Sequence, residues 1–358
     1  MDNVLKLRNR RIGDGMPCYI IAEMSANHGG DINRAKEIIH TAKAAGADCI
    51  KIQTYTADTM TIDCNNEYFR IKEGTWKGES FYELYKKAHT PWEWHEELKD
   101  EAQKAGIDFL STPFDRTAVD FLEELGMEFY KIASFEIVDI PLIDYVASKK
   151  KPIILSTGMA TLGEIETAVN TIRKYGENGL CLLRCSSAYP AIPDDMNLKT
   201  IKHLAETFNC VSGLSDHSMG FVGALVAVCM GASVIEKHFC LSRSIETPDS
   251  LFSMEPNEFK QMTEYIRAAE RAIGKVNYGI SQKEHENKCF RRSVFVVKDM
   301  EKGEIFTHEN IKVIRPAGGI EPKYYNEILG KRAAIGIKRG SPIDWGMVDA
   351  DEDINSNY

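Results

Sequence analysis

Two histidines at the ends of neighbouring apolar runs are the first candidates for chemistry in this sequence. The runs are "VSGLSDH", residues 211–217, and "SVIEKHF", residues 233–239, so His217 and His238 each end a pattern typical of a buried strand. Two neutral imidazoles on adjacent strands can hold a divalent metal and leave other coordination positions open. A single histidine at a strand end is more often only hydrogen-bonded, so the matching positions carry the metal prediction.

Two lysines occupy similar positions at the ends of other apolar runs. Lys51 lies in "DCIKIQTY" and Lys131 in "FYKIASFE". Ammonium groups that share a site with hydroxyl donors can bind a phosphate and a carboxylate. Two alternatives stay open: a Schiff-base lysine, as in barrel aldolases, or a structural lysine that neutralises Glu23 or Glu136. Without the two histidines, the aldolase would rank first. The hydroxyls at comparable strand ends belong to Thr112, Ser134, Ser156, Ser187 and Ser215.

The elements that must position these side chains alternate regularly along the first three quarters of the chain. Eight short apolar runs, beginning with "CYIIAEMSAN" and ending with "SVIEKHF", are separated mostly by stretches with apolar residues at helical spacing. Strand followed by helix, repeated eight times, predicts a (β/α)8 TIM barrel, in which the polar strand ends meet at one mouth. A doubly wound open sheet is the alternative, but its usual GxGxxG loop is missing after the first strand.

Length and composition predict two domains. The chain has 358 residues and a formal net charge of −9, which argues against nucleic-acid or anionic-membrane partners. It has no apolar run long enough for a bilayer and no signal-peptide pattern, so we expect a cytoplasmic protein. We predict a barrel over 1–278, a linker over 279–290, a small, mostly β module over 291–350 and a disordered acidic tail over 351–358.

A long connection, residues 54–95, follows the second predicted strand. It is rich in glycine and aromatic residues. Long insertions at the mouth of a barrel commonly shape a substrate pocket, although a packing lid is an equal alternative. The aromatic residues that are candidates for covering a substrate are Tyr55, Trp76, Tyr82, Trp92 and Trp94.

The ordered set of strand-end motifs resembles the sialic acid synthase family, which condenses phosphoenolpyruvate with an amino sugar. The motifs are "IAEMSANHGGD", "AGADCIKIQTY", "FLSTPFD", "YKIASFE", "ILSTGMAT", "GLSDHS" and "EKHF". The last module, with "FRRS" and "IRPAGGI", resembles the antifreeze-like (SAF) domain of the same family. "AEMSANH" departs from the commoner "AEIGINH", so the pocket floor around residues 24–26 is expected to differ.

Within the family, two stretches resemble the pseudaminic acid synthases. They are "QTYTADTMTI" and "GTWKGESFYELYKKAHTPWEW", and "IRPAGGIEPKYY" agrees with them. This resemblance implies 2,4-diacetamido-2,4,6-trideoxy-L-altrose as the sugar and pseudaminic acid and phosphate as the products. N-acetylneuraminate and legionaminate synthases are the alternatives, and a Schiff-base aldolase is a more distant one. A third class, a non-enzymatic carbohydrate- or ice-binding protein, conflicts with the intact set of polar strand ends.

The resemblance also implies roles for individual residues. His217 and His238 would bind a divalent metal, Mn²⁺ or Mg²⁺. Our own hypothesis for the mechanism is that water adds to C2 of phosphoenolpyruvate, that Glu23 or Glu236 accepts its proton, and that phosphate then leaves by C–O cleavage. Arg315 would reach the sugar from the last module of a second protomer, in a domain-swapped homodimer. The implied phosphoenolpyruvate contacts are Lys51, Thr112, Lys131, Ser134, Ser156, Ser187 and Ser215. The implied sugar contacts are Asn27, Gln53, Glu136, Tyr189, Asp249 and Arg315.

Overall fold

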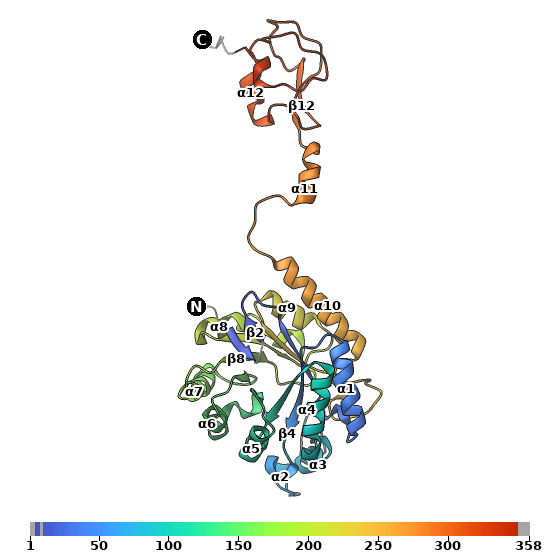
Figure 1. Cartoon of the computed structure of the whole chain (residues 1–358), viewed down its shortest axis with the longest axis vertical. Helices are drawn as coiled ribbons and strands as arrows, with labels where there is room; N and C mark the ends of the chain where they lie inside the picture. Colours follow the sequence, from blue (N-terminus) through green and yellow to red (C-terminus); the bar gives the residue numbers. More distant parts are fainter. Residues whose placement is uncertain (1–3, 8–9, 350–358) are drawn as a thin grey trace. The chain divides into compact units, whose positions relative to one another are not determined.

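The chain forms two compact units, Met1–Gly274 and Lys275–Tyr358. The computed structural model describes residues 4–7 and 10–349 (Figure 1). The predicted acidic tail at 351–358 lies outside the described residues. The domain boundaries at 278 and 290 stay a prediction.

Within the described residues, the first unit contains an eight-stranded parallel sheet. The order is β5-β4-β3-β10-β9-β8-β7-β6, and β5 and β6 pack against each other. The sheet therefore closes on itself, which confirms the predicted TIM barrel. The strands are β3 (Tyr19–Glu23), β4 (Cys49–Thr54), β5 (Asp108–Pro113), β6 (Tyr130–Ile132), β7 (Ile153–Ser156), β8 (Leu180–Cys185), β9 (Val211–Asp216) and β10 (Val234–His238).

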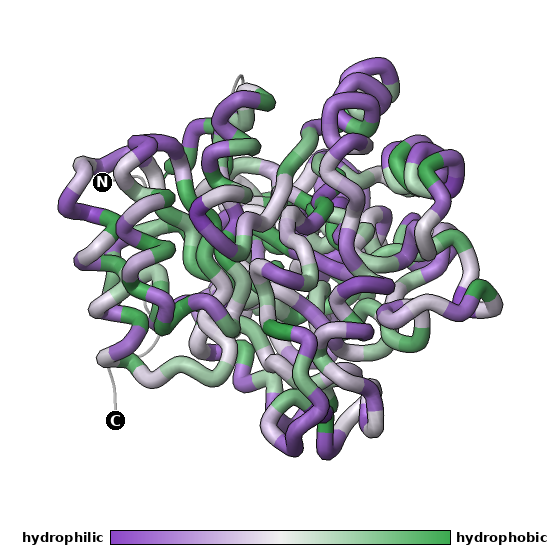
Figure 2. Tube along the Cα trace, turned by 90° about the horizontal axis from the view of Figure 1, so that it is seen from below, coloured by the Kyte–Doolittle hydropathy of each residue, from purple (hydrophilic) through white to green (hydrophobic). Residues whose placement is uncertain are grey.

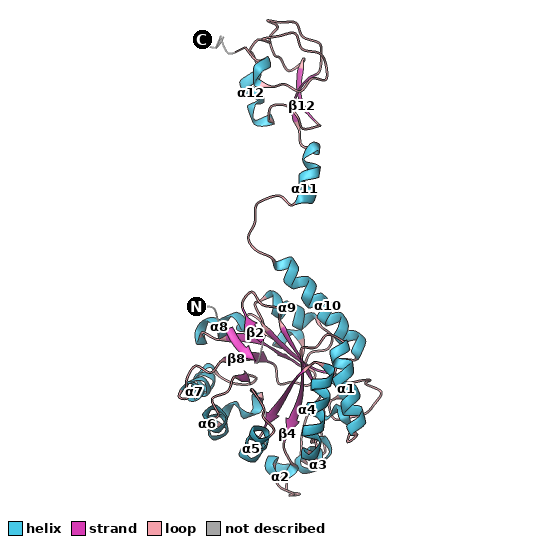
Figure 3. Ribbon diagram, in the orientation of Figure 1, coloured by secondary structure: helices cyan, strands magenta, loops and turns pink. Residues whose placement is uncertain are grey.

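Helices surround the barrel strands (Figure 3). The first, α1 (Ile32–Ala44), begins at Asp31, whose side chain accepts hydrogen bonds from the backbone of Asn33 and Arg34. Its inner face, which includes Ile38 and Ile39, is buried. The others are α2 (Ala57–Met60), α3 (Phe81–Ala88), α4 (His95–Ala105), α5 (Arg116–Glu124), α6 (Ile140–Ser148), α7 (Leu162–Arg173), α8 (Thr200–Phe208), α9 (Val222–Cys229) and α10 (Pro256–Ile273).

Alternation along the strands divides the core of this unit into an outer and an inner part. Side chains such as Ile20 and Ile50 face the helices, while Ile21 and Cys49 belong to a separate cluster inside the barrel. Hydrophilic residues predominate at the periphery (Figure 2). An N-terminal hairpin, β1 (Val4–Leu7) paired with β2 (Arg10–Gly13), adds Leu5, Leu7 and Ile12 to the inner cluster. This hairpin was not predicted from the sequence.

The second unit is a small β-containing module, as predicted. Strand β11 (Ser293–Val296) pairs antiparallel with β12 (Ile311–Ile314), and isolated bridges extend the pairing, for example between Phe295 and Pro342. Its own core includes Val294, Phe306 and Ile343. Its helices are α11 (Gln282–Glu286) and α12 (Tyr325–Ile328). None of the helices in the described parts of either unit combines the length and the apolar character needed to cross a bilayer.

Candidate active site

A pocket lies at the carboxyl ends of the barrel strands, the end at which barrels of this type carry their binding sites. The structure brings together residues from every barrel strand except β8 itself, whose following loop contributes Tyr189. Ala133 and Phe135 line the pocket as well. The predicted site residues that line it are Glu23, Lys51, Gln53, Thr112, Lys131, Ser134, Ser156, Tyr189, Ser215, His217, Glu236 and His238.

Strand alternation explains why β10 ends in three charged or ionisable residues. Successive side chains of a strand point to opposite faces, so Glu236 and His238 share the inner face. Lys237 points to the other face, where its Nζ lies 2.8 Å from Asp216 Oδ2 and donates a hydrogen bond to the Ser218 carbonyl. The Lys237–Asp216 pair is therefore structural, and Asp216 does not line the pocket.

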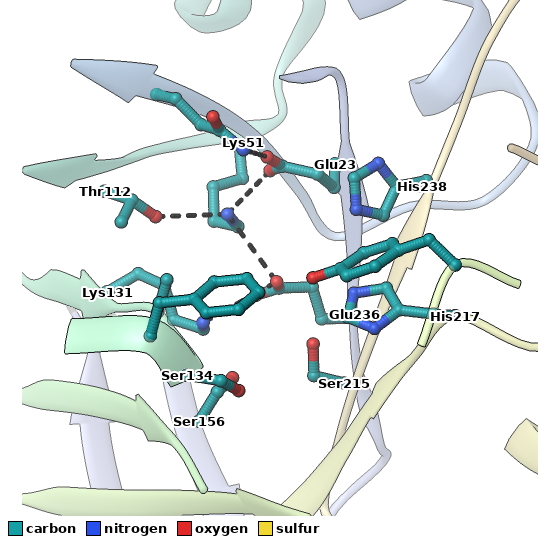
Figure 4. A pocket seen from close by; sticks show the side chains of 14 residues that line it. Glu23, Lys51, Thr112, Lys131, Ser134, Ser156, Ser215, His217, Glu236 and His238 are labelled. Atoms are coloured by element: carbon teal, nitrogen blue, oxygen red, sulfur yellow. Dashed lines mark hydrogen bonds and ion pairs between the residues drawn. The ribbon is translucent and has the colours of Figure 1, made fainter. Parts of the chain in front are cut away.

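Lys51 stands at the centre of a buried charge cluster (Figure 4). Its Nζ lies 2.8 Å from Glu23 Oε2 and 3.5 Å from Glu236 Oε1, and it donates a hydrogen bond of 3.1 Å to Thr112 Oγ1. Lys131 Nζ lies 3.7 Å from Glu236 Oε1. The two lysines thus share one carboxylate, and two ammonium groups face two carboxylates in a space withdrawn from water.

Burial and neighbouring charges set the ionisation of this cluster. Burial raises the pKa of Glu23, and Lys51 offsets that rise only in part. Burial lowers the pKa of Lys131, and Glu236 counters that effect incompletely. For Lys51, burial also lowers the pKa, but Glu23 and Glu236 outweigh it and the pKa ends above its usual value. Lys51 is therefore the more firmly charged of the two cations.

The two predicted metal ligands lie side by side at the ends of paired strands. The ring centroids of His217 and His238 are 5.3 Å apart, and β9 pairs with β10. His217 Nδ1 lies 3.0 Å from the Ser186 carbonyl, which leaves its Nε2 for another partner. Metal-binding histidines commonly use their second nitrogen in this way. His238 Nδ1 is buried and has no hydrogen-bond partner among the described residues.

These observations fit a divalent cation that takes two ligands from the protein. Across the described residues, no group of three or more His, Cys, Asp and Glu side chains is arranged to hold a metal. The pair would leave the remaining positions to substrate and water. The cluster of Lys51, Lys131, Glu23 and Glu236 carries no net formal charge, so an anionic substrate would bring negative charge that a cation beside it would balance.

Five predicted site residues lie outside the pocket lining. Asn27 donates hydrogen bonds to the Phe239 carbonyl and to Ser253 Oγ, and its own oxygen accepts one from Thr247. Ser187 Oγ is 3.8 Å from Cys185 Sγ, beside the site. Arg315 is an exposed residue of the second unit. Asp249 and Glu136 lie near the pocket.

Asp249 and Glu136 are two acids at the edge of the site. Asp249 Oδ2 lies 4.0 Å from His238 Nδ1 and accepts a hydrogen bond from the backbone of Ala26. Glu136 follows β6, and its Oε2 is buried without a hydrogen-bond partner in the described structure. Burial raises the pKa of Glu136 to about 7, although Lys131 pulls it down. Glu136 therefore titrates near neutral pH in the unliganded site.

Cys185, a buried thiol on the inner face of β8, was not predicted as a site residue. Its Sγ is 3.7 Å from His217 Nδ1. The alternation that places Glu236 and His238 inside the barrel applies equally to Leu183 and Cys185, so the sequence did contain the signal. The same rule predicts that the Lys237 side chain, between Glu236 and His238, points away from the pocket.

Comparisons with known proteins agree with this geometry. A family model described as the NeuB family matches residues 38–278, and a SAF domain model matches residues 291–349. A pseudaminic acid synthase from Campylobacter jejuni is 46% identical over 92% of this chain and 96% of its own length. An N,N'-diacetyllegionaminic acid synthase from Legionella pneumophila is 38% identical over 94% of this chain and 96% of its own length.

A solved structure shows the same fold. The N-acetylneuraminic acid (sialic acid) synthetase from Leptospira borgpetersenii, in complex with citrate, superposes with a TM-score of 0.72 at 34% identity, covering 80% of this chain and 95% of that one. The resemblance to the sialic acid synthases is thereby confirmed. The chain belongs to the NeuB family and carries a C-terminal SAF domain.

Proposed function

We propose that this enzyme is a pseudaminic acid synthase. It condenses phosphoenolpyruvate with 2,4-diacetamido-2,4,6-trideoxy-L-altrose and water, and it yields pseudaminic acid and phosphate. The observation that carries the proposal is that two buried lysines and two adjacent imidazoles line one pocket in a NeuB-family barrel. The higher identity to a pseudaminic than to a legionaminic acid synthase supports the choice of sugar.

Phosphoenolpyruvate would occupy the part of the pocket lined by Lys51 and Lys131, here called the lysine side. Lys51 and Lys131 face its phosphate and carboxylate, and a charge-assisted hydrogen bond from each is stronger than a neutral one. Ser156 Oγ is buried at the pocket and has no partner in the described residues, so its hydroxyl is available to donate to an anion. Thr112, Ser134, Ser187 and Ser215 would complete this set of donors.

The reaction needs one carbon–carbon bond and the loss of phosphate from C2. The methylene carbon of phosphoenolpyruvate attacks the carbonyl carbon of the open-chain sugar, water adds at C2, and the C–O bond to phosphate breaks. Glu236 Oε2 is buried without a hydrogen-bond partner in the described part of the chain, so it can accept a proton from that water. Glu23, across Lys51, is the other candidate base. A divalent cation, Mn²⁺ or Mg²⁺, at His217 and His238 would polarise the sugar carbonyl.

The sugar would lie near Tyr189, in the part of the pocket lined by His217 and His238, here called the imidazole side. Gln53 donates hydrogen bonds to Glu23 Oε1 and to Ser25 Oγ, so it is already held in place for a sugar hydroxyl or amide. Glu136 and Asp249 stand at the edge of the same region. Asn27 stays a prediction from the sequence. Its position gives no support for a sugar contact, because the nitrogen and the oxygen of its amide group already hydrogen-bond to other protein groups.

We further propose that two protomers form a domain-swapped homodimer in the cytoplasm, in which the SAF domain of each covers the barrel of the other. Exposed apolar side chains lie in the loops that follow β6 to β9, including Phe135, Met159, Ile192 and Met219. An apolar rim around a polar pocket is typical of a surface that another protein covers. Arg315 would then reach the sugar from the partner.

The test of this function is a phosphate-release assay with phosphoenolpyruvate, Mn²⁺ or Mg²⁺, and a panel of sugars. We expect the highest kcat/KM with 2,4-diacetamido-2,4,6-trideoxy-L-altrose, by at least about tenfold over 2,4-diacetamido-2,4,6-trideoxymannose and N-acetylmannosamine. A clear preference for either of the other sugars would contradict the proposal and support the legionaminate or neuraminate alternative. A borohydride-trapped adduct at Lys51 or Lys131 would instead support the aldolase.

A further inference from the structure

A small hairpin, residues 70–80, projects from the long connection after β4. Arg70 and Ser80 form an antiparallel bridge, and the backbone of Ile71 hydrogen-bonds to that of Gly78 and Glu79. Thr75 and Trp76 lie at its tip. Most of the hairpin is exposed, but Trp76 is half-buried, which shows that its side chain packs against other parts of the chain.

The hairpin tip is hydrogen-bonded to the loops that follow β10 and β8. Trp76 Nε1 donates a hydrogen bond of 2.9 Å to the Pro248 carbonyl, beyond β10, and Thr75 Oγ1 donates one to the Tyr189 carbonyl, beyond β8. Three strands, β3, β10 and β9, separate β4 from β8 in the sheet. The hairpin therefore links loops that the barrel itself keeps apart.

Trp76 completes an aromatic group at the imidazole side of the pocket. Its ring centroid lies 5.7 Å from that of Tyr189 and 6.4 Å from that of Phe252. Tyr189 in turn lies 4.3 Å from the His217 ring, and Phe252 lies 4.9 Å from the His238 ring. Tyr189 lines the pocket, while Trp76 stands behind it.

Other aromatic residues of the same connection pack elsewhere. Tyr82 donates a hydrogen bond to Asp58 on the surface. Trp92 stacks on Phe121, and Trp94 packs edge-on against His28. The pocket thus has two chemically different sides. Lysines and hydroxyls from β4 to β7 form one, and imidazoles backed by Tyr189, Phe252 and Trp76 form the other.

We propose that Trp76 is a positioning residue that sets sugar specificity. The hairpin 70–80 holds Tyr189 over the imidazole side, and the face of the Tyr189 ring favours a sugar edge that carries a methyl group over one that carries a hydroxyl. A hydroxyl pressed against the face of an aromatic ring would lose water without gaining a hydrogen bond, whereas a methyl would not. This inference rests on the proposed function, because it concerns the C6 edge of that enzyme's sugar.

The experiment compares Trp76→Ala with Trp76→Phe and the wild type, using 2,4-diacetamido-2,4,6-trideoxy-L-altrose and its 6-hydroxyl counterpart. For Trp76→Ala we expect the sugar KM to rise about tenfold and the preference for the 6-deoxy sugar to fall by a similar factor. The KM for phosphoenolpyruvate should stay within about twofold. Trp76→Phe should restore most of the preference. Tyr68→Ala, an exposed position in the same connection, is the matched control and should behave as the wild type.

A double-mutant cycle with Tyr189→Ala tests whether Trp76 acts through Tyr189. The two losses in sugar preference should be strongly non-additive, because removal of Tyr189 leaves Trp76 nothing to position. A wild type that prefers the 6-deoxy sugar, with a Trp76→Ala variant that keeps this preference, would overturn the inference alone. Equal rises in both KM values would overturn it as well, since they indicate general disruption. A wild type without the preference would contradict the proposed function itself.

Discussion

A Lys51→Met variant is expected to lose about a thousandfold in kcat/KM for phosphoenolpyruvate, the largest effect of any single change in the pocket. Lys51 carries the more firmly held positive charge of the site, because Glu23 and Glu236 both stabilise it. Methionine has a similar length and no charge, so the anion would lose its main cation. The measurement is steady-state phosphate release as a function of phosphoenolpyruvate concentration.

The same substitution should also destabilise the fold. It leaves two buried carboxylates without their shared partner, and breaking a buried ion pair commonly costs about 3–5 kcal/mol. Lys237→Met is the matched control. Lys237 is equally buried, its Nζ pairs with Asp216 at the same distance of 2.8 Å, and it faces away from the pocket. Urea unfolding should show similar losses of unfolding free energy for both variants.

The comparison separates chemistry from stability. We expect Lys237→Met, assayed well below its unfolding temperature, to keep a kcat/KM for phosphoenolpyruvate within a fewfold of the wild type. If Lys237→Met lost as much activity as Lys51→Met, the activity lost in Lys51→Met would come from a destabilised fold. The assignment of Lys51 to the anion site would then be wrong.

A His217→Ala variant is expected to weaken Mn²⁺ binding by more than about a hundredfold, because it removes one of the two proposed protein ligands. Changes to residues that only hydrogen-bond to a ligand already cost about 10–100-fold in metal affinity. Isothermal titration with Mn²⁺ measures this without any substrate. Activity should fall by a comparable factor. In the wild type, a chelator should abolish phosphate release, and added Mn²⁺ or Mg²⁺ should restore it.

His203→Ala is the control for the metal prediction. His203 lies on α8 and is exposed, so its loss should change neither Mn²⁺ binding nor turnover. Near-normal Mn²⁺ affinity in His217→Ala, with a wild type that binds the ion, would place the metal elsewhere and remove our assignment of the histidine pair.

Much of the barrel could be predicted because its signals are local. Apolar residues at helical spacing indicated the helices, and in α1 this spacing puts Ile38 and Ile39 on one buried face. The strand ends were also visible in the sequence. The carboxyl ends of parallel strands in a closed barrel share one rim, so Lys51, Lys131, His217 and His238 could be predicted to converge.

What the sequence did not reveal depends on contacts between distant segments. Trp76 and Tyr189 are 113 residues apart, and no local pattern says that a hairpin after β4 will reach the loop after β8. The satisfied amide of Asn27 depends in the same way on Phe239, Thr247 and Ser253. The N-terminal hairpin that adds Leu5 and Leu7 to the inner core is too short to stand out by periodicity.

The most direct test of the account follows the bridging oxygen of phosphoenolpyruvate. The enzyme would be incubated with 2,4-diacetamido-2,4,6-trideoxy-L-altrose and phosphoenolpyruvate that carries oxygen-18 between C2 and phosphorus, and both products would be weighed by mass spectrometry. If water adds at C2 and the C–O bond then breaks, the label leaves entirely with phosphate, and the nine-carbon acid is unlabelled. Label retained in the acid, or phosphate released without any nine-carbon product, would contradict the proposed condensation.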